Sequence, residues 1–500
     1  MCVPPRDRRI PPVNDATPRT APGGAAKGAL SELVRDGRAA YTIIVVAGAG
    51  VHALQILVIA IIMPTIVADI GGAAYYAWPS MLYTVGSIIG ASSIGPVWAA
   101  LGPRRGYALS GLVFVIGTAV CAVAPDMAVL NAARGVQGYA GGLVSGGGMA
   151  LISGLFEARL RTRVLSLTQG TFTACHLLGP VAGGIFAAVG WWRGSFWVMV
   201  PILAGFALLT WFKVPANIAG EAEHVRGAGF AFGRLTTLTA GVFCVAATGP
   251  IDRPELRVAL LALAVVLVWV AFRLDRGAVN RLFPSRALSF SSPVGLALWI
   301  LLLAGLAQTA ITLFLPLLLQ VVHGVTPVII NFVTMTISGG WTVGTFLVAG
   351  WSGTRERVAL ATGPVLCLAG LAGIAAAAST VGALGLVLLT LAAFVMGVGI
   401  GLYNVHLVAR TMESAAKGES RTTASSMSMI RSLGTAFGAA IAGVIVIEAG
   451  LGTATEPAAV DRAVSTLYFA SLVPLALAAL CMARFLRLGR ARAAPGQAEG

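Results

Sequence analysis

Charged residues are scarce in this chain of 500 residues: Asp, Glu, Lys and Arg together make up 11% of it, whereas apolar residues make up 57%. Soluble globular proteins carry about 25% charged residues, so this composition excludes an ordinary water-soluble chain. The mean hydropathy of +0.87 requires much apolar surface to face something other than water, and lipid is the usual environment. The sequence therefore predicts an integral membrane protein surrounded by a lipid bilayer.

Cysteine is also rare, and motifs typical of enzymes are missing. The six cysteines are scattered singly, with no CxxC pair and no Cys/His cluster, which excludes a disulfide framework and a zinc site. The chain has no HExxH, GxSxG or P-loop motif and no paired carboxylates within an apolar run. We therefore expect no metal, no cofactor, no enzymatic activity and no ATP hydrolysis by this chain.

Acidic residues are outnumbered, with 19 Asp and Glu against 34 Lys and Arg and a net charge of +15. A nucleic-acid-binding protein would gather basic residues on one soluble face beside aromatic side chains, whereas here they lie between hydrophobic segments. We expect no nucleic-acid partner. Residues 1–40 are basic and lack an apolar stretch before Tyr41, so the sequence predicts a disordered cytoplasmic tail there and no cleaved signal peptide.

Long apolar runs, in contrast, are abundant. A helix needs about 20 apolar residues to cross a bilayer, and fourteen such runs are found. They lie near residues 41–68, 76–100, 107–125, 127–155, 163–190, 194–213, 233–250, 257–273, 292–320, 327–350, 358–379, 382–409, 421–447 and 464–486.

The distribution of Lys and Arg tests this count, because basic residues accumulate in cytoplasmic loops. With the N-terminal tail inside, inward segments hold 28 of the 34 basic residues and outward loops hold four, while Arg134 and Arg431 fall inside spans. This distribution favours an even number of spans with both termini in the cytoplasm. A twelve-span count without the weak runs at 233–250 and 257–273 has the same parity and stays open.

Short motifs follow one another along these runs, and together they resemble a known family. They are PTIVADIG with Asp69 at 64–71, GPVWAALGPRR with Gly95, Gly102, Arg104 and Arg105 at 95–105, RGVQG at 134–138, GPVAGG at 179–184, WWR at 191–193, FLPLLLQ at 314–320 and RSLG at 431–434. In this order, over roughly residues 41–487, the chain resembles the major facilitator superfamily, specifically its fourteen-span drug/proton antiporter (multidrug efflux) family.

The resemblance implies an all-α membrane protein with two six-helix bundles of major facilitator type and two extra central spans, located in the cytoplasmic (inner) membrane. The bundles correspond to residues 41–213 and 291–487, the linker with the extra spans to 214–290, and a second cytoplasmic tail to 488–500. Such folds bind substrate near the midplane and expose it alternately to each side. In the family, the GPxxGG motif is associated with exporters.

The fifth span has a physical signature of its own. Gly179 and Gly183 form a face on which another helix can approach closely, and Pro180 between them bends the helix. With Gly184 and the nearby His176, this span is predicted to be a flexing contact between the two halves. Close packing alone is the alternative interpretation.

Arg134 is the costliest residue to insert, because an ionised side chain inside a span costs about 2.5 to 3.5 kcal/mol and generally faces the bundle interior or water. It indicates a central cavity; the alternative is a structural side chain that pairs with backbone carbonyls. If spans one, four, nine and twelve line that cavity, the substrate and proton pathway has these polar candidates: His52, Gln55, Asn131, Arg134, Gln137, Gln308, Thr309, Thr312, Asn404 and His406.

Two positions depart from the family pattern. Gln55 stands where the family often has an aspartate in span one, and Ala99 stands where it has an aspartate that latches the two halves. Arg104 and Arg105 are then most simply topology determinants. Without a carboxylate in the cavity, a permanent organic cation would lack a counter-charge, so neutral or anionic amphiphiles are favoured. Proton coupling would fall to a histidine, namely His52, His176 or His406.

Two other functions stay open. One is a metabolite importer or facilitator without proton coupling, and the other is a non-transporting membrane sensor with the same fold. The identity of the small-molecule substrate and the oligomeric state have no signal in the sequence.

Overall fold

The computed structural model describes residues 38–216, 232–248, 251, 253–278, 281–287, 289–416, 419–451 and 456–493, and every regular element in these residues is helical. Of the tail predicted at 1–40, residues 1–37 lie outside the described residues, as do the stretch 217–231 and residues 494–500. The first helix begins at Arg38 and the last ends at Ala493. The helices therefore extend a few residues into both segments that the composition assigned to tails.

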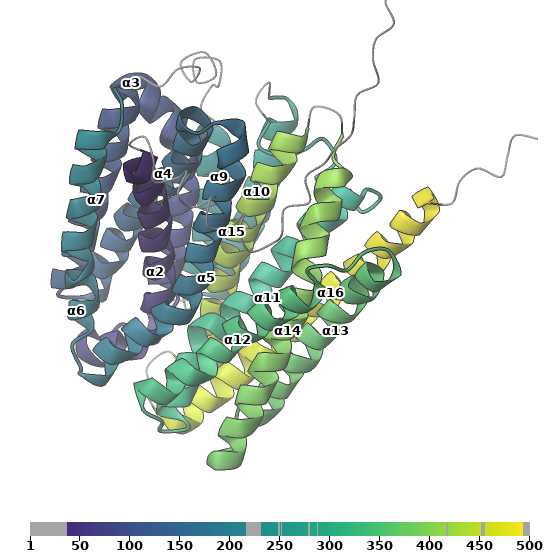
Figure 1. Ribbon diagram of the computed structural model, residues 1–500. Helices are drawn as coiled ribbons and strands as arrows, with labels where there is room; N and C mark the ends of the chain where they lie inside the picture. The colour runs from purple at the N-terminus through teal and green to yellow at the C-terminus, as the bar shows by residue number, and fades with distance from the viewer. Residues whose placement is uncertain are drawn as a thin grey trace, which may run out of the picture.

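The first half is a bundle of long antiparallel helices, drawn in purple to blue in Figure 1. Its elements are α2 (Arg38–Ile70), η1 (Ala73–Tyr75), α3 (Trp78–Val123), α4 (Met127–Leu155), α5 (Ala158–Ala188), α6 (Trp192–Trp197) and α7 (Met199–Lys213). Helix α3 contains the runs predicted as spans two and three. Its direction changes at Gly102, whose φ of 78° is a conformation that glycine adopts without steric cost.

A helix pair and a second bundle follow. The pair is α9 (Phe232–Ala247) and α10 (Pro254–Arg276). The bundle, green to yellow in Figure 1, consists of α11 (Pro293–Val321), α12 (Pro327–Val348), α13 (Thr354–Ala377), α14 (Ala383–Glu413), α15 (Ser420–Val446), η2 (Ile447–Leu451) and α16 (Pro457–Ala493).

Among the described residues, each of the fourteen apolar runs lies in a helix over most of its length, so the prediction of an all-helical membrane architecture is confirmed. Within the described residues, ten helical stretches are long and apolar enough to cross a membrane, and one of them, residues 73–123, contains the bend at Gly102. The apolar stretch Gly233–Ala247 of α9 is shorter than these. The count of fourteen spans stays a prediction.

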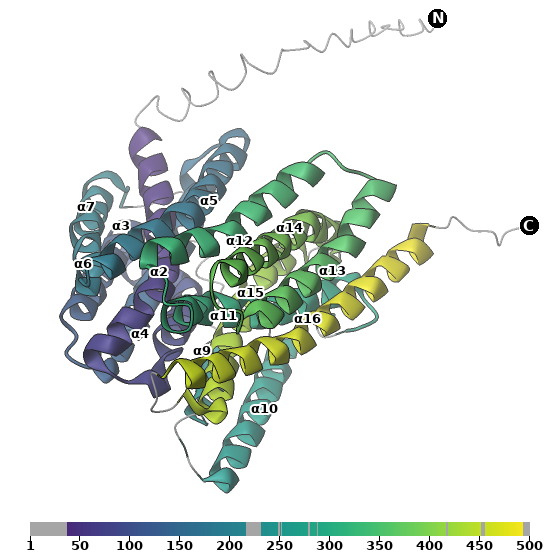
Figure 2. The same ribbon diagram turned by 90° about the horizontal axis from the view of Figure 1, so that it is seen from below.

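The two halves meet mainly where α2 packs against α11, α3 against α15 and α5 against α12. Figures 1 and 2 show the two bundles side by side in both views. One apolar core continues from one half into the other; it includes Ile62 of α2 and Phe314 of α11, both without exposed surface. Within the first half, α3 and α4 approach so closely that a Cβ on Gly138 would lie 2.1 Å from the carbonyl oxygen of Tyr83. This approach brings Tyr83 beside Arg134.

Candidate functional site

Arg134 of α4 is completely buried and is held by groups from three helices. Its Nε donates to the Pro79 carbonyl of α3 and its Nη2 to the Gln55 carbonyl of α2, both at 3.2 Å. Its Nη1 donates to Oε1 of Gln137, one turn further along α4. The guanidinium also lies over the ring of Tyr83, 4.2 Å from the centroid. These acceptors are neutral, so the positive charge of Arg134 is solvated by the protein but not cancelled.

Tyr83 connects this arginine to His52. The hydroxyl of Tyr83 lies 2.9 Å from Nδ1 of His52, and the two rings are stacked with their centroids 5.6 Å apart. The result is a layered arrangement of imidazole, phenol and guanidinium, contributed by α2, α3 and α4. Tyr83 is not among the sequence candidates, because a tyrosine in an apolar run gives no sign of the direction in which it points.

Behind this layer, Gln137 extends the polar network. Its Nε2 donates to Oγ1 of Thr118 at 2.9 Å, while its Oε1 accepts from Arg134. Two neighbouring amides are less well satisfied within the described part of the chain: Nε2 of Gln55 and Oδ1 of Asn131 are buried without a hydrogen-bond partner.

A cavity of about 240 Å³ lies between the two halves. Its wall is formed by residues of α2, α3, α4 and α5 from the first half and of α11, α12, α14 and α15 from the second. Most of the wall is apolar, with a smaller set of polar side chains: Ser80, Tyr83, Thr84, Arg134, Gln308, Thr309, Thr312, Thr334, Ser338 and Thr435. An apolar pocket with a few polar groups is the usual form of a small-molecule site.

The predicted pathway residues divide between this wall and the protein interior. Arg134, Gln308, Thr309 and Thr312 line the cavity, whereas His52, Gln55, Asn131 and Gln137 are buried in the first half without being part of the wall. In α14, Asn404 accepts a 2.8 Å hydrogen bond from Arg431, and His406 is buried further along the helix. Neither of these two residues lines the cavity, to which α14 contributes Met396 and Ile400.

Most threonines of the wall use their hydroxyl protons within their own helices. Thr309 donates to the Gly305 carbonyl at 2.7 Å and Thr312 to the Gln308 carbonyl at 3.0 Å, and Thr334 likewise donates to the Ile330 carbonyl. The side-chain amide of Gln308 makes no hydrogen bond within the described residues, so both its donor and its acceptor are available to a ligand. No Asp or Glu of the described chain lines the cavity.

Helix α5 contacts both halves through its glycine motif. A Cβ on Gly179 would lie 3.1 Å from Leu57, and one on Gly183 the same distance from Ile61, so these two glycines face α2. Gly184 faces the other half: a Cβ there would lie 1.8 Å from Nδ2 of Asn331 in α12. Pro180 lines the cavity. The side chain of His176 lies outside the described part of the structure.

The remaining motif residues brace the first half internally. Asp69, at the end of α2, accepts hydrogen bonds from Nε1 of Trp192 at 3.1 Å and from Arg193. At the bend of α3, Arg104 donates to the Trp211 carbonyl of α7 and lies over the Trp211 ring.

Other motif positions at the bend of α3 are less buried and have a smaller part in the packing of the first half. Arg105 and Ala99 are exposed, and Gly95 is half-buried.

In the second half, Arg410 of α14 makes a two-pronged ion pair with Glu356 of α13. Sequence reasoning did not single out this pair.

A membrane-embedded helical bundle with a cavity between two halves is the architecture of a transporter. Residues 45–439 match the sequence profile of the Major Facilitator Superfamily, and the chain belongs to this superfamily. Its members are transporters of small molecules and not enzymes.

Relatives and solved structures agree with this assignment. A probable multidrug-efflux transporter of Mycobacterium tuberculosis (strain H37Rv) is 32% identical over 415 residues, which cover 81% of this chain and 87% of that protein. Efflux pump dotC of Dothistroma septosporum is 28% identical over 55% of this chain and 48% of the pump.

Two structures have the same fold. A bacterial homologue of the human lysosomal transporter Spinster, in an inward-facing and occupied conformation, matches with a TM-score of 0.58 and 13% identity over 91% of this chain and 97% of that one. A D-xylose–proton symporter matches with a TM-score of 0.59 and 15% identity over 89% and 96%.

Proposed function

We propose that this protein is a secondary active transporter that exports small amphiphilic compounds, drugs or metabolites, by alternating access. The observation that carries the proposal is the cavity between the halves, whose wall is apolar for the larger part and carries polar side chains from both bundles. The multidrug-efflux name of the 32% identical relative supports export as the direction. The association of the GPxxGG motif with exporters in the drug/proton antiporter family supports the same direction.

The preferred substrates are neutral or anionic amphiphiles. Arg134 contributes a positive charge to the wall, and its hydrogen-bond partners are carbonyl and amide oxygens that leave this charge uncompensated. Electrostatic interactions are stronger in a low-dielectric interior than in water. A permanent organic cation would therefore be repelled by Arg134 and would find no carboxylate in the described wall to replace its lost hydration.

Proton coupling is assigned to His52 acting through Tyr83. Tyr83 lines the cavity, and its hydroxyl is hydrogen-bonded to Nδ1 of His52, which is not part of the wall. A phenol can donate and accept at once, so it provides a hydrogen-bonded path from the cavity to the imidazole. The imidazole is the side chain whose unperturbed form changes its charge in the physiological pH range, and a change on His52 would be felt by the nearby guanidinium of Arg134.

In the cell, the protein is placed in the cytoplasmic membrane with fourteen spans and both termini in the cytoplasm. The concentration of Lys and Arg on one side of the span pattern supports this orientation. Helices α9 and α10 form the additional pair of crossings. With this orientation, export moves substrate away from the side on which both termini lie.

Transport into inside-out proteoliposomes tests the proposal. The probes are three amphiphiles of matched size: one neutral, one with a sulfonate and one with a quaternary ammonium group. We expect uptake of the neutral and anionic probes to rise with an acidic lumen, and slow uptake of the cation. Equal uptake of all three would contradict the substrate preference. Uptake of the preferred probes that does not respond to the proton gradient would contradict antiport and favour a facilitator.

A further inference from the structure

The α9–α10 pair contains the one buried carboxylate of the described chain. Asp275, in the last turn of α10, has 3% of its surface exposed. It lies outside the cavity, and the transport mechanism proposed above does not use it. A buried charge is expensive unless it is paired and hydrogen-bonded, so its partners indicate what this carboxylate stabilises.

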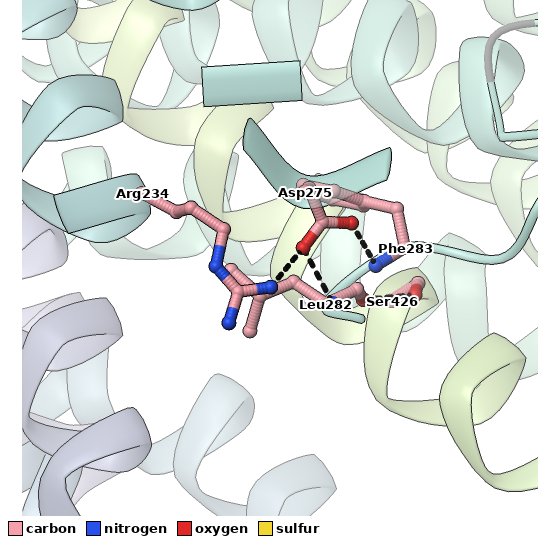
Figure 3. Close-up of polar contacts among 5 residues, drawn as sticks. All are labelled: Arg234, Asp275, Leu282, Phe283 and Ser426. Carbon is pink, nitrogen blue, oxygen red and sulfur yellow. Dashed lines mark hydrogen bonds and ion pairs between the residues drawn. The ribbon is translucent and has the colours of Figure 1, made fainter. Parts of the chain in front are cut away.

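The partners of Asp275 come from α9 and from the segment that follows α10. Arg234 of α9 makes an ion pair with Oδ1 of Asp275, and the side chain of this arginine is only 11% exposed. The backbone N–H groups of Leu282 and Phe283 donate to the two oxygens at 2.8 and 3.0 Å. Figure 3 shows these groups converging on the carboxylate. Asp275 thus joins α9, α10 and the segment that leads to the second half.

The same segment is fixed to α15. Oγ of Ser426 donates to the Leu282 carbonyl at 2.7 Å (Figure 3). Nearby, Glu419 accepts from the backbone N–H and the hydroxyl of Ser285. One end of the pair is therefore linked to the beginning of α15 through a continuous set of polar contacts.

The opposite end of α10 has a second anchor on the same half. Arg257 pairs with Glu448 of η2, which continues α15. Arg257 and Asp275 are separated by about 27 Å along the helix axis at 1.5 Å per residue. Two anchors this far apart hold both the position and the tilt of α10 relative to α15.

The contact with the first half is of a different kind. Helix α9 packs against α15 and also touches α3. Trp78 of α3 meets Phe243 of α9 edge to face, with ring centroids 6.5 Å apart. An apolar contact of this type can slide or separate without leaving a buried hydrogen-bonding group unpaired, unlike the anchors of Asp275.

We propose that α9 and α10 move as a rigid part of the second half and slide over α3 during alternating access, covering the seam between α3 and α15. The pair is therefore not an independent linker between the bundles. This inference rests on the proposed function only in requiring that the two halves move relative to each other.

Distances between spin labels in nanodiscs test the movement directly. Cysteines replace the exposed Leu101 of the first half, Arg276 of α10 and Glu413 of the second half, in pairs, in a chain whose native cysteines are substituted. The conditions are those under which the Leu101–Glu413 distance changes. We expect the Arg276–Leu101 distance to change with it and the Arg276–Glu413 distance to stay constant. A constant Arg276–Leu101 distance, or a change in both distances from Arg276, would overturn the proposal.

The anchor itself is tested with Asp275→Asn, which removes the negative charge at nearly constant size. We expect the Arg276–Glu413 distance distribution to broaden at least twofold. The matched control is Glu448→Gln in the exposed anchor, for which a smaller broadening is expected.

If Asp275→Asn does not fold, the double variant Arg234→Met/Asp275→Leu serves instead, because it removes both buried charges together. An unchanged distribution in the folded variant would overturn the role of Asp275. Loss of transport with the expected distance pattern would count against the proposed substrate and leave this inference standing.

Discussion

Arg134 combines two roles that the sequence presents as alternatives. Its guanidinium is bonded to backbone carbonyls of α2 and α3, as a structural arginine would be, and it also lies in the cavity wall. The charge is therefore held in place by the first half, and its field would reach a substrate bound in the cavity. A direct hydrogen bond to the substrate is not needed for this effect.

Replacing Arg134 with Met is expected to reduce the preference for anionic over neutral probes. Two unit charges about 8 Å apart interact by about 2 kcal/mol at an effective dielectric constant near 20, which corresponds to roughly 30-fold in relative affinity. The measurement is uptake of the matched sulfonate and neutral probes. Arg134→Lys retains the charge but loses the planar donor geometry, so it should keep most of the preference at lower protein stability. An unchanged preference in Arg134→Met would remove the electrostatic argument.

Tyr83→Phe separates coupling from transport. The substitution removes the hydroxyl bonded to His52 but keeps the ring under Arg134. We expect proton-driven uptake to fall about tenfold while uptake down a substrate gradient continues. Tyr107→Phe is the matched control, because this buried tyrosine donates to the Val144 carbonyl away from the cavity. Equal effects of the two variants would argue against a pathway through Tyr83.

The contact between α5 and α12 shows how a glycine of the GPVAGG motif can set the distance between the two halves. A Cβ on Gly184 would overlap Nδ2 of Asn331, so any larger residue must displace α12 or its side chain. Gly179 and Gly183 face α2 instead, within the same half. One motif therefore serves both an internal contact and a contact between the halves.

Gly184→Ala is expected to open the end of the interface at which α5 finishes and α12 begins. Modification of a cysteine at Thr312 by a thiol reagent from that side should accelerate severalfold. Adding Asn331→Ala to the same chain should restore the slow rate, because it removes the overlapping side chain. Gly170→Ala, on the same helix with no atom within 4 Å of the new Cβ, should have no effect. Acceleration in Gly170→Ala, or no rescue in the double variant, would refute this mechanism.

Across the whole chain, the amino-acid sequence predicted the helices well and the residues of the candidate site only in part. The length of the apolar runs was enough to predict the helices, and the position of a charged residue inside such a run identified Arg134 as a candidate. The sequence could not predict that Tyr83 contacts Arg134 or that Asn331 contacts Gly184. Tyr83 and Asn331 lie in helices whose rotation about their own axes is set by packing. The sequence gives no sign that Asp275 is buried, because its burial arises from the segment at Leu282 folding back onto α10.

Topology can be tested by labelling intact cells with an impermeant maleimide, using single cysteines at Leu101, Val189 and Arg253. We expect the cysteines at Val189 and Arg253 to be labelled from outside and the one at Leu101 only after permeabilisation. The result at Arg253 separates fourteen spans from twelve, because a twelve-span chain would keep this residue inside. Labelling of the cysteine at Leu101 in intact cells would show that the orientation is the reverse of the one proposed.

The placement of the groups that hold Arg134 also matters during synthesis. Gln55, Pro79 and Tyr83 precede Arg134 in the chain, so their helices leave the ribosome before α4 does, whereas Gln137 follows on α4 itself. If α2 and α3 are already in the bilayer when Arg134 enters the translocon, the carbonyls and the aromatic ring that solvate its charge are within reach. We expect this chain order to lower the insertion penalty of Arg134, which α4 would meet in full if it were translated first.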